Sequence, residues 1–154
     1  MAWALQAARE AAIGPVWVVT GAAPIADSLL PPGTRVVPNP HWADGQATSL
    51  AVALDLAGTE GYQRIVVGLG DQPLVSSSAW QAVARGSAPI TVATYRGRRG
   101  NPVGLGCEIW AQLPRKGDAG ARTVIRRSPQ LVEEVACDGN PVDIDTVEDL
   151  RLWS

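Results

Sequence analysis

Stretches of apolar residues alternate with polar loops along the chain, and their spacing predicts alternating strands and helices. Apolar runs, continuous or alternating with polar residues, predict strands at residues 16–20, 34–38, 64–69, 89–95, 102–105 and 131–136. Alanine-rich or apolar segments with helical spacing predict helices at residues 2–13, 24–30, 49–57, 79–85, 108–113, 121–126 and 147–152. This alternation predicts an α/β fold, a three-layer α/β/α sandwich around a mostly parallel sheet.

The composition fits a single folded domain over residues 1–154. Of the 154 residues, 46% are apolar and 18% are charged, which is enough apolar material for one core. The formal net charge of -2 excludes a broad electrostatic grip on nucleic acid or on an anionic membrane. No apolar run is long enough to cross a membrane, and no basic leader precedes the first apolar residues. We therefore expect a cytoplasmic protein with no nucleic-acid or membrane partner.

The cysteines and the histidine exclude several kinds of site. Cys107 and Cys137 lie far apart in the sequence and match no metal or disulfide spacing, so we expect reduced thiols. The single histidine, His41, argues against a His-based metal site and against a Ser-His triad. The candidate chemistry is carried instead by acidic residues and by glycine-bearing loops.

Three aspartates are candidate ligands for a hard cation. Asp71 directly follows the predicted strand at residues 64–69, which places its carboxylate at the carboxyl edge of the sheet, where it can hold Mg²⁺. Asp143 and Asp145 are separated by one residue, so their side chains point the same way in an extended segment and can complete such a site. The alternatives are a plain turn at Asp71, before Pro73, and capping of the last helix by Asp145 or Thr146.

Three loops are candidate anion sites. Residues 39–49 carry Gly45 and Ser49 into a helix, where backbone amides and a hydroxyl can hold a base or a phosphate. Residues 96–102 hold three arginines, which suit a phosphate-bearing acceptor, and residues 117–122 form a glycine-rich start to another helix. The alternatives are a capped loop, a solvated basic hairpin tip and a simple turn, respectively.

Five short motifs occur in order along nearly the whole chain. They are Asn39-Pro-x-Trp-x-x-Gly45-x-x-x-Ser49-Leu50, Gly70-Asp71-Gln72-Pro73, Gly100-Asn101-Pro102, Gly117-Asp118-x-Gly120-Ala121 and Asp143-Ile144-Asp145-Thr146-x-Glu148-Asp149-Leu150. Together they resemble the MobA/MocA-like nucleotidyltransferases, which join a nucleotide to a molybdenum-cofactor pterin. The resemblance implies a Rossmann-like α/β/α sandwich with a mixed seven-stranded sheet. The motifs point to the family more specifically than to the substrate.

The resemblance also implies a role for each motif. It implies that Mg²⁺ is held by Asp71 together with Asp143 or Asp145. The residues implied to line the nucleotide pocket are Asn39, Gly45, Ser49, Gly70 and Asp71. Those implied to face the acceptor are Arg98, Gly100, Asn101, Pro102 and Asp118. The implied reaction is attack of a pterin phosphate on the α-phosphorus of CTP or GTP with release of pyrophosphate. The expected protein partners are a second copy of the chain or a molybdoenzyme that the protein helps to mature.

The chain departs from the family at its beginning. The family opens with a strand and a loop of the form Leu-Ala-Ala-Gly-x-Ser-x-Arg-x-Gly-x-x-Lys, and this sequence has no counterpart before residue 16; its single lysine, Lys116, lies far along the chain. We therefore expect a sheet without its first central strand, which leaves residues 16–20 and 64–69 without their shared neighbour.

Three explanations stay open. Met1 can be an internal residue of a longer reading frame, a partner chain can supply the strand, or the protein can be a shortened, inactive relative that binds nucleotide or a partner. A sugar-phosphate nucleotidyltransferase is a further alternative within the enzyme class.

Overall fold

The computed structural model describes residues 1–139, which form six strands and four α-helices. The strands are β1 (Trp17–Thr20), β2 (Arg35–Pro38), β3 (Arg64–Val67), β4 (Ile90–Tyr95), β5 (Arg98–Gly106) and β6 (Val132–Ala136). The α-helices are α1 (Ala2–Glu10), α2 (Gln46–Thr59), α3 (Ser77–Ala84) and α4 (Arg122–Arg127). Short 3₁₀ turns are η1 (Asp27–Leu29), η2 (Trp42–Asp44), η3 (Cys107–Gln112) and η4 (Pro129–Leu131). The helix predicted at residues 147–152 lies outside the described residues.

The strands are mostly parallel, as predicted, with one strand running against the others. β1 and β2 form a parallel pair, and β3, β5, β4 and β6 form a four-stranded sheet in that order. β5 is antiparallel to β3 and to β4, whereas β4 and β6 are parallel. The reversal at β5 follows from the two-residue turn Arg96–Gly97, where both φ angles are positive (51° and 79°), the geometry that joins neighbouring antiparallel strands.

The predicted interruption of the sheet lies between β1 and β3. Within residues 1–139, β1 pairs with β2 alone and β3 pairs with β5 alone, so each has one open edge. None of the eight residues of these two strands is buried, whereas all six residues of β4, which has a neighbour on each side, are buried. Helix α2 contacts both strands, and the rings of Trp17 and Tyr62 meet at 5.5 Å beside the starts of the two strands.

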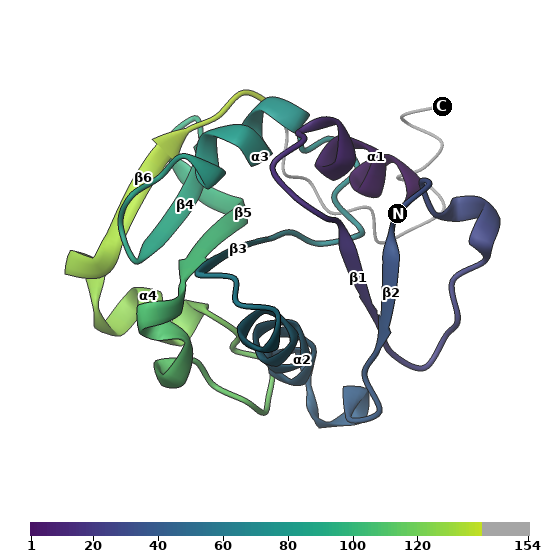
Figure 1. Ribbon diagram of the computed structural model, residues 1–154. Helices are drawn as coiled ribbons and strands as arrows, with labels where there is room; N and C mark the ends of the chain where they lie inside the picture. The colour runs from purple at the N-terminus through teal and green to yellow at the C-terminus, as the bar shows by residue number, and fades with distance from the viewer. Residues whose placement is uncertain (140–154) are drawn as a thin grey trace.

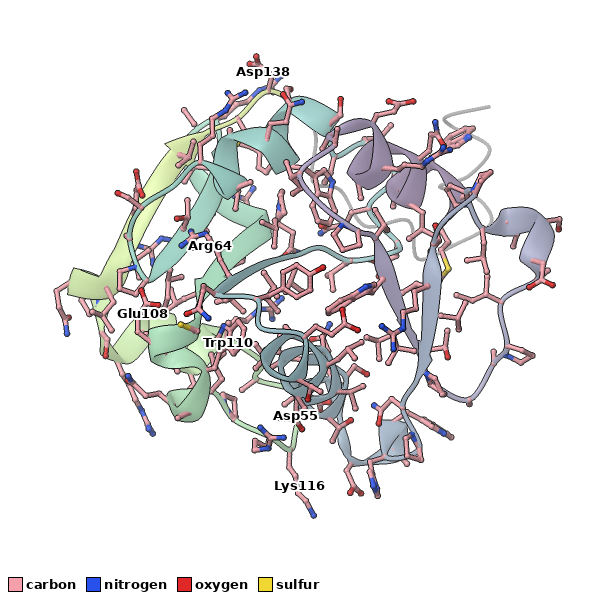
Figure 2. The ribbon with its side chains drawn as sticks, in the orientation of Figure 1. Asp55, Arg64, Glu108, Trp110, Lys116 and Asp138 are labelled. Carbon is pink, nitrogen blue, oxygen red and sulfur yellow. The ribbon has the colours of Figure 1, made fainter. Side chains whose placement is uncertain are left out.

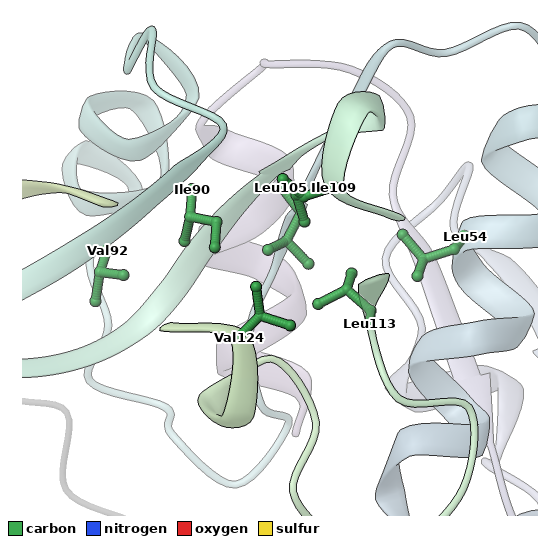
Figure 3. Close-up of a cluster of buried hydrophobic side chains, with 7 residues drawn as sticks. All are labelled: Leu54, Ile90, Val92, Leu105, Ile109, Leu113 and Val124. Carbon is green, nitrogen blue, oxygen red and sulfur yellow. The ribbon is translucent and has the colours of Figure 1, made fainter. Parts of the chain in front are cut away.

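Helices cover both faces of the four-stranded sheet (Figure 1). α1 and α3 pack together on one side, and α2 and α4 lie on the other. Alternate residues of β4 supply the two cores, because successive side chains of a strand point to opposite faces. On the α2 side, Ile90 and Val92 join Leu54, Leu105, Ile109, Leu113 and Val124 (Figure 3). On the α3 side, Ala93 and Tyr95 join Val75, Ala79 and Val83.

Several predicted boundaries are wrong, and contacts distant in sequence explain the clearest cases. The helix predicted at 49–57 begins at Gln46, because the segment around Gly117 binds the backbone of its first turn. The strand predicted at 102–105 begins at Arg98, because β4 pairs with the polar residues before it. The segments predicted as helices at 24–30 and 108–113 contain 3₁₀ turns instead. No helix within residues 1–139 is both long and apolar enough to span a bilayer.

Candidate functional site

The loop after β3 carries the aspartate that was predicted to hold a cation. Asp71 is exposed, and within residues 1–139 no hydrogen bond or ion pair holds its carboxylate. The preceding residue, Gly70, lies against the start of α1, since a Cβ built on Gly70 would be 3.3 Å from Cε of Met1. An unpaired carboxylate at the end of a strand is a suitable hard ligand for a divalent cation.

A buried network joins the Asp71 loop to β5. The side chain of Gln72 is 6% exposed, and its Oε1 accepts a hydrogen bond of 3.1 Å from Nδ2 of Asn101. The hydroxyl of Tyr95 donates to the carbonyl oxygen of Asn101 at 2.6 Å. Burial, with a smaller contribution from Cys137, raises the pKa of Tyr95, which keeps the hydroxyl protonated as a donor. Two predicted motifs, around Asp71 and around Asn101, therefore lie side by side.

Gln72 and Tyr95 are the site residues that sequence reasoning missed. Gln72 stands inside a motif whose candidate chemistry is its acid, and Tyr95 is the last residue of a predicted strand, at residues 89–95. A buried glutamine needs a hydrogen-bond partner, and Asn101 of the following motif is the residue that the sequence offers for that role. The amide of Asn101 bonds within the protein, so its predicted contact with the acceptor is not needed to explain its presence.

The basic segment at residues 96–102 forms a hairpin, which was the alternative to a phosphate-binding loop. Arg98 and Arg99 are exposed at the start of β5, and Arg99 pairs with Glu134 at 2.6 Å. Arg98 has no ion-pair partner within residues 1–139, so its guanidinium is available to an anion. Pro102, predicted to face the acceptor, is fully buried, whereas Gly100 is partly exposed.

The segment at residues 39–49 is held together by its own side chains. Asn39 is 2% exposed, and its Nδ2 donates to the hydroxyls of Thr48 at 2.8 Å and Ser49 at 3.0 Å. Its Oδ1 accepts from the backbone amide of His41 at 2.9 Å. The predicted nucleotide ligands Asn39 and Ser49 thus bond to each other, and the motif spacing also has a purely architectural explanation. The Ser49 hydroxyl accepts this bond and keeps a hydrogen to donate.

Gly45 brings a second motif to this segment. Its φ is +104°, and a Cβ placed on it would lie 2.5 Å from the backbone of Gly117, so both the conformation and the contact require glycine. The amide of Ala47 donates to the carbonyl of Gly117 at 2.8 Å, and the amide of Gly117 donates to the carbonyl of Asp44 at 2.8 Å. Motifs that lie 72 residues apart in sequence therefore form one unit.

Two charged residues of this unit lie at the start of α2. A carboxylate oxygen of Asp118, predicted to face the acceptor, accepts from the backbone amide of Gln46 at 3.3 Å, a favourable place for a negative charge. Nζ of Lys116 lies 3.8 Å from a carboxylate oxygen of Asp44 and projects outward beyond α2 (Figure 2). Although Lys116 is remote in sequence from residues 39–49, the fold places it beside them.

The metal site predicted from Asp71, Asp143 and Asp145 falls only in part within the described residues. Within the described part of the chain, no three His, Cys, Asp or Glu side chains gather in a metal-binding group. Asp143 and Asp145, predicted to act with Asp71, lie outside the described residues. The three-carboxylate site therefore stays a prediction.

Comparison with known proteins decides the family. The family model of the MobA-like NTP transferase domain matches residues 1–134. The chain belongs to this family. Over 129 aligned residues, this MobA-like chain is 30% identical to nicotine blue oxidoreductase of Paenarthrobacter nicotinovorans. The alignment covers 75% of this chain and 62% of that protein. The chain therefore spans less than two thirds of the length of that relative.

Solved structures agree with the MobA-like assignment. Rv0371c from Mycobacterium tuberculosis H37Rv superimposes with a TM-score of 0.73 at 27% identity, over 97% of this chain and 82% of the other. The same protein in complex with manganese gives a TM-score of 0.71 at 27% identity, over 96% and 83% of the two chains. A nucleotidyl transferase from Methanothermobacter thermautotroptrophicus gives a TM-score of 0.79 at 22% identity, over 97% and 76%, and at that identity shows the fold alone.

Proposed function

We propose that this protein transfers a nucleoside monophosphate from CTP or GTP to the phosphate of a pterin acceptor, with release of pyrophosphate. The observation that carries the proposal is the bond between Gln72 and Asn101, which joins the loop of Asp71 to the basic hairpin. A cation ligand for a triphosphate and arginines for an acceptor phosphate then belong to one region of the molecule. Membership of a family of NTP transferases supports the same reaction class.

Asp71 is the described residue that would hold a divalent cation, Mg²⁺ in our proposal. Its exposed, unpaired carboxylate fits a hard cation, and Asp143 or Asp145 would complete the ligand set. The related Rv0371c has been solved in complex with manganese, which supports a divalent ion. When bound, such an ion neutralises charge on the phosphate oxygens.

The other residues bind and orient the two substrates. The guanidinium of Arg98, which has no ion-pair partner among residues 1–139, would hold the acceptor phosphate, since Arg matches phosphate geometry. The Ser49 hydroxyl, Gly45 and Gly70 would contact the nucleotide. An oxygen of the acceptor phosphate attacks the α-phosphorus, a new P–O bond forms, and the bond to pyrophosphate breaks in line.

A second function is favoured by one specific observation. The relative at 30% identity is named nicotine blue oxidoreductase, so an oxidoreductase activity is a second candidate for this chain. The inactive relative and the sugar-phosphate nucleotidyltransferase are the remaining alternatives, and the choice of acceptor separates the latter from the pterin enzyme.

The test measures pyrophosphate release by the chain with each of the four NTPs, Mg²⁺, and either molybdopterin or a sugar 1-phosphate. We expect release with CTP or GTP and molybdopterin. Asp71→Asn should lower the rate at least about 100-fold, since metal-assisted charge neutralisation contributes several kcal/mol.

The matched control is Asp27→Asn, an exposed aspartate of η1, which should leave the rate unchanged. Full activity of Asp71→Asn would contradict the role of that residue. Absence of release with every NTP, combined with redox turnover of nicotine blue when an electron donor or acceptor is supplied, would favour the oxidoreductase instead.

A further inference from the structure

Trp42 is a large apolar side chain that lies at the surface and outside the buried clusters of residues 1–139. It lies in η2, between the end of β2 and the start of α2, and it is 50% exposed. It belongs to neither of the two buried clusters, whereas Trp110 and Trp80 each pack against one of them. The indole of Trp17 has partners too, in Tyr62 and Arg35.

The side chain of Trp42 packs against Gly21. Gly21 directly follows β1, and a Cβ built on it would lie 3.1 Å from Cβ and 3.4 Å from Cγ of Trp42. The φ of Gly21 is not in the left-handed region, so its conformation does not require glycine. The close approach of Trp42 is what favours glycine at this position. The inner part of the side chain is therefore fixed against backbone, and half of its surface stays open.

The backbone around Trp42 is braced on both sides. The amide of Asn39 donates to the carbonyl of Thr20 at 2.8 Å, which ties the segment to β1. The amide of Asp44 donates to the carbonyl of His41 at 3.0 Å, and the amide of Gly45 donates to the carbonyl of Trp42 itself at 3.3 Å. A backbone held in place before binding does not have to be ordered when a ligand arrives, which lowers the entropic cost of binding.

We propose that Trp42 is a stacking platform for a planar heteroaromatic ring, the base of the nucleotide or the pterin of the acceptor. This inference rests on the proposed function and names a ring-binding residue for it. Trp42 follows the carboxyl ends of the parallel strands β1 and β2, the edge where ligands of α/β sheets bind. A fixed indole with an open surface offers a flat ring both dispersion and quadrupole attraction.

The test measures binding by calorimetry to the full chain and to Trp42→Ala and Trp42→Phe. The probes are CTP, GTP, neopterin and inorganic tripolyphosphate, which has no ring. Trp42→Ala should weaken binding of the relevant ring about tenfold or more, the effect typical of base–aromatic stacking, and Trp42→Phe should weaken it less. Tripolyphosphate should bind equally to all three proteins. The ring that loses affinity identifies the platform as the base site or the pterin site.

The matched control is Trp3→Ala, which removes a tryptophan that is 58% exposed on α1 and should leave all affinities unchanged. Unaltered ring binding by Trp42→Ala overturns the proposal, as does an equal loss for tripolyphosphate or a wild type that binds none of the rings. Ring binding that depends on Trp42, in a protein that releases no pyrophosphate, supports the platform while contradicting the proposed reaction. Circular dichroism of Trp42→Phe verifies that the comparison is between folded proteins.

Discussion

Asn39 shows how far a motif residue can be used by the fold itself. Its side chain makes hydrogen bonds to Thr48, Ser49 and the amide of His41, and it is almost completely buried. A buried polar group left without partners costs about 1–3 kcal/mol, so the segment at residues 39–49 depends on this side chain for its shape. Asp71 is the opposite case, because its carboxylate is exposed and unpaired within residues 1–139. Among the predicted site residues, the exposed ones are therefore the stronger candidates for direct contact with ligands.

Tyr95 should make the protein sensitive to alkali. Its pKa is raised above the ordinary value of 10.0 by burial, so above pH 10 an unfolded chain loses a proton that the folded chain retains. The free energy of unfolding is therefore constant with respect to this group below pH 10 and falls as the pH rises toward the folded pKa. We expect a loss of up to about 1.4 kcal/mol per pH unit, measured by urea unfolding between pH 8 and pH 11.5.

Tyr95→Phe should be less stable than the wild type at pH 8, because the carbonyl of Asn101 loses a donor, but its alkaline slope should be smaller. The remaining slope belongs in part to Cys137, whose pKa burial also raises. Tyr62→Phe, at a tyrosine that is 37% exposed, is the matched tyrosine-to-phenylalanine variant. An identical slope for Tyr95→Phe and wild type would show that Tyr95 does not set the alkaline limit.

The elements β1 and β3 are connected by side chains where backbone hydrogen bonds are lacking. The rings of Trp17 and Tyr62 are 5.5 Å apart and nearly perpendicular, at 79°. We predict that a double-mutant cycle with Trp17→Leu and Tyr62→Leu gives a coupling of about 0.5–1.5 kcal/mol, measured by chemical denaturation. The same cycle with Trp3→Leu in place of Trp17→Leu should give no coupling, since Trp3 lies on α1. A coupling near zero for the first pair would mean that the ring contact does not join the two sheets.

Element types were easier to predict than element ends, for a physical reason. Each of the six strands of residues 1–139 overlaps a predicted strand segment, because a strand in a sheet packs at least one face against other elements and so carries apolar residues in a continuous or alternating pattern. The start of β5 was missed because Arg98, Arg99 and Gly100 carry no apolar side chain and belong to the strand through their pairing with β4. The start of α2 was missed because its first turn binds Gly117 and Asp118, far away in sequence. Local pattern carries no information on such contacts.

At the scale of the whole molecule, the order of the motifs indicated the family, but only the fold shows which motifs meet. Gly45 packs on Gly117, and Gln72 bonds to Asn101, and neither pairing follows from spacing along the chain. The candidate site residues therefore lie on two separate loops, each following a strand of a different sheet. The segment at residues 39–49 follows β2, whereas the loop of Asp71 follows β3.

The separation of the two sheets within residues 1–139 predicts that they differ in stability. β4 has neighbours on both sides and all its residues are buried, whereas β1 and β2 pair only with each other within residues 1–139. We predict that backbone amides of β4 exchange with solvent roughly 100-fold more slowly than those of β1 and β2, because the smaller sheet can open without the larger one. Native-state hydrogen exchange followed by mass spectrometry measures the difference. Equal protection of both sheets would show that they unfold as one unit.

A nucleotide that contacts both the segment at residues 39–49 and the loop of Asp71 should slow amide exchange in β1 and β2 selectively, because a ligand stabilises the folded form to which it binds. The control is inorganic pyrophosphate, which has no ring for Trp42 and should protect β1 and β2 less than CTP or GTP does.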